Sequence, residues 1–259
     1  MPLIEAGDIR IHYSLTGAVA APLVIFSNSL GTNLSMWDAQ ARALEGQFRV
    51  LRYDTRGHGE TSVTPGPYTI AQLGQDVVNL LDALDIDRVR FCGLSMGGMI
   101  GQWLGILAGK RAERLILCST GAKIGDGEIW NTRIENVRRN GLKAMAPAVV
   151  ERWLTADFRA RHPEVVAKTL SMLEASPMEG YVACCEAIRD ADLRERITAI
   201  HIPTLVISGT KDPATPPSDG RFLVERIPGA RYVELDSSHL SNVECASQFT
   251  AELIKFLSD

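Results

Sequence analysis

The sequence lacks the charge pattern of a nucleic-acid-binding protein and the apolar run of a membrane protein. Among its 259 residues, 27 Lys and Arg stand against 31 Asp and Glu, a formal net charge of −4, with no basic stripe interleaved with aromatic residues. No uninterrupted apolar stretch approaches the roughly 20 residues that cross a bilayer, and the opening residues lack a basic segment followed by an apolar one. We therefore expect a cytoplasmic protein without a nucleic-acid or membrane partner.

Cysteine is also scarce, and it forms no metal-binding or disulfide pattern. Of the five cysteines, Cys92 and Cys118 lie in apolar runs and are expected to be buried, reduced thiols, while the adjacent Cys184 and Cys185 are interpreted as two small residues on a helix. The histidines lack metal-ligand spacing, and the segment "GLSMGG" (93–98) matches neither a dinucleotide-binding nor a phosphate-binding loop. The sequence thus predicts no metal and no cofactor.

What the sequence does contain is a repeated alternation of short apolar runs and helical patterns. Runs rich in β-branched and aromatic residues predict strands at 9–13, 23–26, 48–53, 89–92, 114–118, 204–208 and 231–235. The middle runs are apolar almost throughout, as in a parallel sheet covered on both faces. One of the intervening helices begins with a capping box formed by Thr69 and Gln72. This order predicts an α/β fold with a mostly parallel, doubly wound sheet.

The alternation stops between Cys118 and Thr204, where helical patterns occur without a convincing strand. We interpret residues 124–189 as a helical cap inserted over the carboxyl edge of the sheet, where open α/β sheets bind ligands. The core is then expected in two parts, residues 1–123 and 190–259.

Ser95 is the candidate nucleophile. It lies at the centre of G-x-S-x-G, directly after the strand predicted at 89–92 and directly before a helical pattern. That context is the nucleophile elbow, a tight turn that exposes a serine hydroxyl at the carboxyl edge of a sheet. Glycine at positions 93 and 97 removes Cβ atoms where such a turn must pack closely.

A serine hydroxyl needs a base and an acid that orients the base. His239 follows the last predicted strand by four residues, and Asp212 follows the strand at 204–208 by four residues, so both belong at the same edge as Ser95. The chain order Ser95, Asp212, His239 is that of the α/β-hydrolase triad. The histidines placed elsewhere by the pattern are His12, His58, His162 and His201.

Acyl transfer also requires donors to the oxyanion. In this fold one donor is the backbone N–H after the nucleophile, here Met96, and the second comes from the loop after the strand at 23–26, where Leu30 is the candidate. Many α/β hydrolases have His-Gly where this chain has Asn28 and Ser29.

Several motifs together resemble the 3-oxoadipate enol-lactonases of aromatic-acid catabolism over nearly the whole chain. They are "SNSLGTNLSMW", "RYDTRGHGETS", "GPYTIAQL", "FCGLSMGGM", "LVISGTKDPATPP" and "SSHLSNVE". The resemblance implies hydrolysis of 3-oxoadipate enol-lactone to 3-oxoadipate, with Ser95, Asp212 and His239 as the triad.

The implied substrate is a small anionic lactone, but residues 124–190 hold nine Lys and Arg against ten Asp and Glu, so the cap has no bulk positive charge. A specific arginine is needed instead. Trp130 and Arg133 lie three residues apart on a predicted helix and could both face the cleft. The alternative places Arg133 on a solvated face and Trp130 in the core. Arg56 is interpreted as structural.

Two other functions use the same features. One is a broad carboxylesterase or cofactor-free perhydrolase with the same triad, which differs in its rates on enol-lactones and simple aryl esters. The other is a ligand receptor that keeps the hydrolase fold without turnover. The sequence leaves the oligomeric state open.

Overall fold

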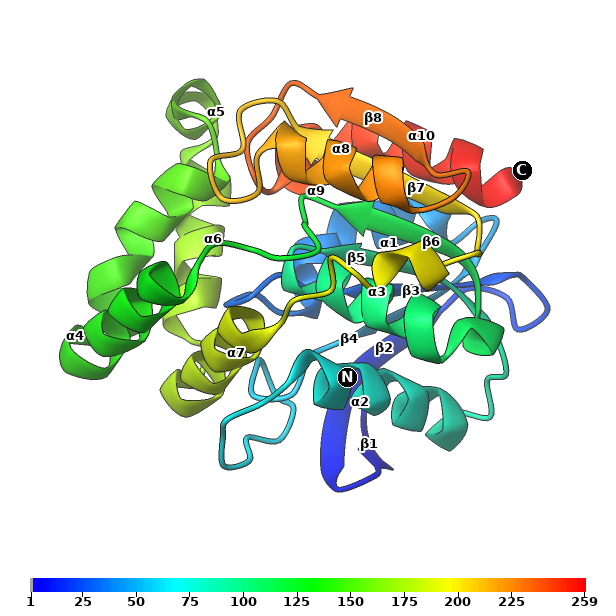
Figure 1. Cartoon of the computed structure of the whole chain (residues 1–259), viewed down its shortest axis with the longest axis horizontal. Helices are drawn as coiled ribbons and strands as arrows, with labels where there is room; N and C mark the ends of the chain where they lie inside the picture. The colour runs from blue at the N-terminus through cyan, green and yellow to red at the C-terminus, as the bar shows by residue number, and fades with distance from the viewer. Residues whose placement is uncertain (1) are drawn as a thin grey trace.

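The computed structural model describes residues 2–259, which form one eight-stranded sheet flanked by helices (Figure 1). The strand order is β1-β2-β4-β3-β5-β6-β7-β8. The pairs β1–β2 and β2–β4 are antiparallel, and the neighbours from β4 onward in this order are all parallel. The strands are β1 Leu3–Ala6, β2 Ile9–Thr16, β3 Leu23–Ser27, β4 Arg49–Tyr53, β5 Val89–Leu94, β6 Ala112–Cys118, β7 Thr204–Gly209 and β8 Arg231–Leu235.

Helices cover both faces of this sheet, which explains why its central strands are apolar throughout. Helices α2, α3 and α8 lie on one face and α1 and α10 on the other (Figure 1). The helices are α1 Asp38–Leu44, α2 Ile70–Ala83, α3 Met96–Leu107, α4 Gly127–Trp153, α5 Ala156–Arg161, α6 Pro163–Glu174, α7 Met178–Asp190, α8 Pro217–Arg226, α9 Ser241–Glu244 and α10 Ala246–Ser258, with short 3-10 turns η1 Leu34–Trp37, η2 Gly109–Arg111 and η3 Ile197–Ala199. The predicted doubly wound α/β fold is confirmed.

The sequence patterns located every strand except one. Every predicted strand is present, and α2 begins where expected, because the Thr69 hydroxyl accepts the backbone N–H of Gln72 at 3.0 Å. Strand β1 was not predicted. It has only four residues, most of them exposed or half-buried, and pairs on one side only, so it carries no apolar run.

The topology creates a crevice at the carboxyl edge, between β3 and β5. The chain passes from β3 outward to β4 and returns to β5 on the other side of β3, where Ser27 lies beside Gly93. Such a reversal leaves the loops after the two strands side by side, the usual ligand site of an open α/β sheet. The loops that begin at Asn28 and at Ser95 are these two.

Helices α4 to α7 lie between β6 and β7 in the chain and gather beyond the carboxyl ends of the parallel strands (left in Figure 1). Helix α4 is broken at Gly141, whose φ of 76° and ψ of 166° are not helical, so its two halves run in different directions. The domain boundaries at residues 124 and 189 stay a prediction. Within residues 2–259, no helix combines the length and apolarity needed for a bilayer span.

Candidate active site

Ser95 occupies the sharp turn between β5 and α3. Its φ of 57° and ψ of −112° lie outside the favoured regions for an L-residue, and the surrounding backbone holds it there. The Ser95 N–H donates to the carbonyl of Cys118 at 2.9 Å, and the Thr120 hydroxyl donates to the Ser95 carbonyl at 2.8 Å. The end of β6 therefore fixes the serine in a strained conformation that no sequence pattern other than the elbow predicts.

The two glycines of the elbow are required by close backbone approach. A Cβ on Gly93 would lie 2.1 Å from the carbonyl oxygen of Gly97, and a Cβ on Gly97 would lie 2.4 Å from the carbonyl oxygen of Ser27. Both distances are far below van der Waals contact with atoms of the backbone, which cannot move aside. These contacts bring the start of α3 against the end of β3.

His239 and Asp212 meet in the position that the sequence predicts for base and acid. His239 Nδ1 is 2.8 Å from Asp212 Oδ2, and both side chains are buried. The other oxygen of Asp212 accepts the N–H groups of Ala214 and Thr215, and the Thr215 hydroxyl donates to Oδ2. Because Nδ1 faces a carboxylate, it carries the proton, and Nε2 is left as the basic nitrogen.

The environment keeps Asp212 ionised. Burial alone favours the neutral acid, but the charge and hydrogen bond of His239 and the donors from Thr215 outweigh it, and the pKa of Asp212 lies below its ordinary value. An ionised Asp212 can stabilise an imidazolium that forms at His239 during proton transfer.

Leu30 and Met96 are placed so that their backbone N–H groups remain available. Leu30 follows β3, and Met96 is the first residue of α3 with its side chain in the core. Within residues 2–259, neither N–H donates to a protein acceptor. The arrangement fits an oxyanion hole, and the role of both residues stays a prediction.

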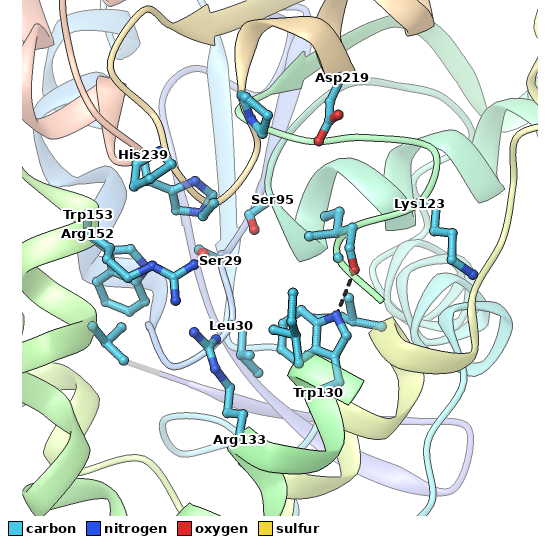
Figure 2. Close-up of a pocket in the computed structure, with 18 residues that line it drawn as sticks. Ser29, Leu30, Ser95, Lys123, Trp130, Arg133, Arg152, Trp153, Asp219 and His239 are labelled. Carbon is cyan, nitrogen blue, oxygen red and sulfur yellow. Dashed lines mark hydrogen bonds between the residues drawn. The ribbon is translucent and has the colours of Figure 1, made fainter. Parts of the chain in front are cut away.

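One cavity of about 330 Å³ collects most of the candidate residues (Figure 2). Ser95, His239, Leu30, Trp130 and Arg133 line it, whereas Asp212 lies behind His239. None of the other four histidines lines this cavity. The structure thus brings together residues from both parts of the core and from α4.

The sequence left two placements open for Trp130 and Arg133: both facing the cleft, or Trp130 in the core with Arg133 on a solvated face. The structure agrees partly with each. Trp130 is buried and its Nε1 donates to the carbonyl of Ile124 at 2.7 Å, as in a core residue, yet its ring also borders the cavity. The Arg133 guanidinium carbon lies 5.0 Å from the centre of that ring and faces the cavity (Figure 2). Binding of a substrate carboxylate by this pair stays a prediction.

Sequence reasoning missed three charged residues of the cavity, Lys123, Arg152 and Asp219. Lys123 follows β6 and pairs with Asp192 at 3.6 Å. Arg152, from the second half of α4, faces the same space as Arg133, and burial followed by the nearby charge of Arg133 lowers its pKa. Asp219, from the start of α8, lies on the opposite wall, where burial and the charge of Asp212 raise its pKa to about 6. The Asn-Gly pair at 140–141, a turn signal, was the only hint that the helix reverses and returns Arg152 to Arg133.

The thiols have the placement that the sequence predicts. Cys92 and Cys118 are buried free thiols with sulfur atoms 3.9 Å apart, and Cys184 and Cys185 lie side by side in the chain on α7. In the part of the chain from residue 2 onward, no group of three or more His, Cys, Asp or Glu side chains is arranged to hold a metal ion.

Comparison with known proteins agrees with this geometry. A family model described as the alpha/beta hydrolase fold matches residues 22–245. The chain is 45% identical to 3-oxoadipate enol-lactonase 2 of Acinetobacter baylyi, over 95% of this chain and 92% of that protein, and 41% identical to 3-oxoadipate enol-lactonase 1 of the same organism, over 92% and 90%. The crystal structure of the enol-lactonase from Burkholderia xenovorans superimposes with a TM-score of 0.98 at 48% identity, over 100% of both chains.

Proposed function

The chain belongs to the α/β-hydrolase family and, within it, to the 3-oxoadipate enol-lactonases, and from that premise we propose that it hydrolyses 3-oxoadipate enol-lactone to 3-oxoadipate. One observation carries the proposal. The elbow serine and the histidine held by Asp212 open onto a small cavity together with Arg133 and Arg152, neither of which forms an ion pair within residues 2–259. The cavity therefore joins a nucleophile to a site for an anion.

The geometry supports an acyl-enzyme reaction. Ser95 Oγ attacks the lactone carbonyl while His239 Nε2 takes its proton, and the N–H groups of Leu30 and Met96 stabilise the oxyanion. Collapse breaks the bond to the ring oxygen, and the enol oxygen takes the proton from His239. Because acyl and leaving groups belong to one molecule, the opened chain stays attached to Ser95 and the enol becomes a ketone there. Water, deprotonated by His239, then releases the second carboxylate and restores Ser95.

The arginine pair accounts for the choice of an anionic substrate. A guanidinium holds a carboxylate with two parallel hydrogen bonds, and two unpaired guanidiniums in a partly buried cavity repel each other until an anion lies between them. Burial lowers the pKa of Arg152 most, and the nearby charge of Arg133 lowers it further, as expected for two cations in one cavity. A small lactone with one carboxylate relieves their repulsion, whereas an uncharged ester does not.

The test compares substrates across arginine variants. In Arg133→Ala and Arg152→Ala, kcat/KM for the enol-lactone should fall roughly 10- to 100-fold, the effect of a lost charged hydrogen bond of about 1.5–3 kcal/mol, with little change on 4-nitrophenyl acetate. A lysine at either position should restore only part of the lost kcat/KM, because its ammonium group cannot form the two parallel hydrogen bonds of a planar guanidinium. Arg138→Ala is the matched control, since this α4 arginine pairs with Glu186 at an exposed site. Equal losses on both substrates would mean that the arginines only support the cap, and no loss on either substrate would place them outside the substrate site.

The cytoplasmic location expected from the sequence belongs to this proposal as well. Its support is the set of five free cysteines, a state that the reducing cytoplasm maintains. Fractionation of cells that express the protein from its own promoter tests it, and enrichment outside the cytoplasmic fraction would contradict it.

A further inference from the structure

His58 lies in the segment that follows β4 and contacts the loop that carries Leu30. Its imidazole is completely buried, and its Nε2 accepts the backbone N–H of Gly31 at 2.8 Å. Gly31 is the residue after Leu30. The triad does not use His58, and the cavity is not lined by it. A buried histidine is thus bonded to the residue beside the second oxyanion donor.

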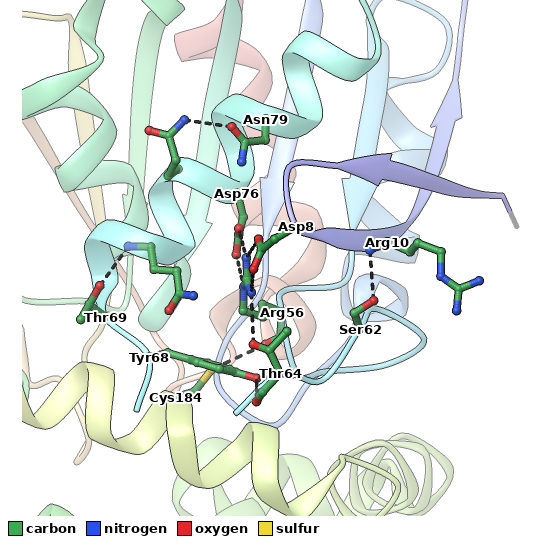
Figure 3. A network of polar contacts seen from close by, with 12 residues as sticks. Asp8, Arg10, Arg56, Ser62, Thr64, Tyr68, Thr69, Asp76, Asn79 and Cys184 are labelled. Atoms are coloured by element: carbon green, nitrogen blue, oxygen red, sulfur yellow. Dashed lines mark hydrogen bonds and ion pairs between the residues drawn. The ribbon is translucent and has the colours of Figure 1, made fainter. Parts of the chain in front are cut away.

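The imidazole acts here as an acceptor. Burial lowers the pKa of His58 to about 4, so the ring is neutral at neutral pH. Since Nε2 accepts a hydrogen bond, the proton is on Nδ1, which faces the carbonyl of Arg56 at 3.4 Å and the sulfur of Cys184 at 4.0 Å. The segment itself is rigid, because the Arg56 guanidinium is held by Asp76 and Asp8 (Figure 3).

A second contact fixes the other side of the same loop. Asp54, at the start of the segment, accepts the backbone N–H of Leu34 at 2.7 Å, and its other oxygen is bonded to His12 at 2.6 Å. The turn from Gly31 to Leu34 is therefore anchored at both ends to residues 54–58.

We propose that His58 is a positioning residue for the oxyanion hole. Its bond to Gly31 fixes the peptide plane between Leu30 and Gly31. The adjoining Ser29–Leu30 plane, which carries the Leu30 N–H, belongs to the same turn, because the Thr32 hydroxyl donates to the Ser29 carbonyl at 2.7 Å. Anchoring this turn at Gly31 therefore holds the direction of the Leu30 N–H. An oxyanion donor must stand within about 0.5 Å and 10–20° of its working position, and a loop without this anchor samples a wider range. The inference rests on the proposed role of Leu30 in acyl transfer and holds for any ester that Ser95 attacks.

The test replaces the acceptor while keeping the volume. In His58→Leu the acceptor is lost, and kcat should fall on the order of 100-fold on both the enol-lactone and 4-nitrophenyl acetate, with KM nearly unchanged. In His58→Gln the amide oxygen can take the place of Nε2, and kcat should be at least ten-fold higher than in His58→Leu. If His58→Leu does not fold, His58→Asn serves instead, because its shorter side chain matches Nδ1 and should lower kcat similarly.

Two inhibitors separate positioning from general loss of structure. Phenylboronic acid forms a tetrahedral adduct on Ser95 that uses the oxyanion hole, whereas adipate, an unreactive dicarboxylate, does not. His58→Leu should raise Ki for phenylboronic acid at least ten-fold and leave Ki for adipate unchanged. Leu80→Ala, a change at a buried α2 residue that does not line the cavity, controls for stability and should leave kcat and both Ki values unchanged at 25 °C.

Three results would overturn the inference: unchanged kcat in His58→Leu, no recovery in His58→Gln, or equal shifts of both inhibitors. Failure of the proposed function looks different. If the protein does not turn over the enol-lactone but His58→Leu still slows 4-nitrophenyl acetate hydrolysis, the positioning role stands and the substrate assignment fails.

Discussion

At the residue scale, His239 is bonded to Asp212 and shares a cavity with Ser95, so we predict that the three side chains act as a unit. His239→Ala should lower kcat by on the order of 10⁵-fold or more, and Asp212→Asn by about 10⁴-fold, because the latter loses only the orientation and stabilisation of the imidazole. Adding Ser95→Ala to His239→Ala should cost little more. Steady-state hydrolysis of the enol-lactone measures all three, with His162→Ala on the cap as control.

Independent effects in the double variant would contradict this account. If losses from Ser95→Ala and His239→Ala multiplied, the two side chains would serve separate steps rather than one proton transfer.

The depressed pKa of His58 also makes stability depend on pH. Its folded pKa of about 4 lies below the unfolded value of about 6.5, so the unfolded chain binds a proton between these pH values and the folded chain does not. This contribution to the unfolding free energy is fully present above about pH 6.5. It should be lost as pH falls toward 4, by up to about 3 kcal/mol.

Urea unfolding at pH 7, 6, 5 and 4.5 checks this, with His58→Gln as reference. The neighbouring charges of Asp54 and Arg56 are common to both proteins, so the difference between the curves isolates His58. The wild type should lose stability faster than the variant below pH 6.5. Parallel curves would show that His58 is protonated in the folded protein or exposed to solvent.

At the element scale, the break in α4 sets the distance between the two arginines. Gly141 has a backbone conformation almost exclusive to glycine, and no atom lies within 4 Å of a Cβ placed there. Gly141→Ala should therefore cost about 1–3 kcal/mol of unfolding free energy through backbone strain alone. It should also raise KM for the enol-lactone, because relief of the strain turns Arg152 relative to Arg133.

Gly127→Ala is the matched control, because it lies at the start of the same helix with equally open space and a φ outside the positive range. It should be neutral or stabilise by up to about 1 kcal/mol. Chemical denaturation and KM for the lactone measure both variants. Equal behaviour of the two would mean that the break does not depend on the glycine conformation.

The break at Gly141 also explains why the sequence predicted some residues of the site and missed Arg152. Ser95, Asp212 and His239 each come after a strand, and parallel strands end at one edge, so strand patterns alone placed them together. Arg133 lies one turn after Trp130 on a continuous helical stretch and could be placed likewise. Arg152 could not, because its position depends on the direction of the chain after Gly141, which periodicity does not encode.

Contacts between loops were equally invisible in the sequence. His58 and Gly31 lie 27 residues apart and meet only because β4 and β3 are neighbours with their loops at one edge. Strand β1 escaped because an exposed four-residue edge strand has no apolar pattern. Sequence patterns predicted the residues whose positions follow from the order of the strands. They did not predict residues whose positions depend on tertiary contacts.

At the scale of the whole molecule, the proposed recognition of an anionic substrate is local. A formal net charge of −4 does not attract an anion over long distances, and surface charges are screened within about 8–10 Å in physiological salt. The arginines inside the cavity are screened much less. We therefore expect the cap to supply charge selectivity and the core to supply the reaction.

The most direct test of the account is kcat/KM of the purified protein for 3-oxoadipate enol-lactone beside that for 4-nitrophenyl acetate. We predict a value for the lactone in the ordinary enzyme range of about 10⁴–10⁸ M⁻¹ s⁻¹, at least roughly 100-fold above the aryl ester, with 3-oxoadipate as the product and loss of turnover in Ser95→Ala. A higher value for the aryl ester than for the lactone, or lactone turnover that persists in Ser95→Ala, would contradict it.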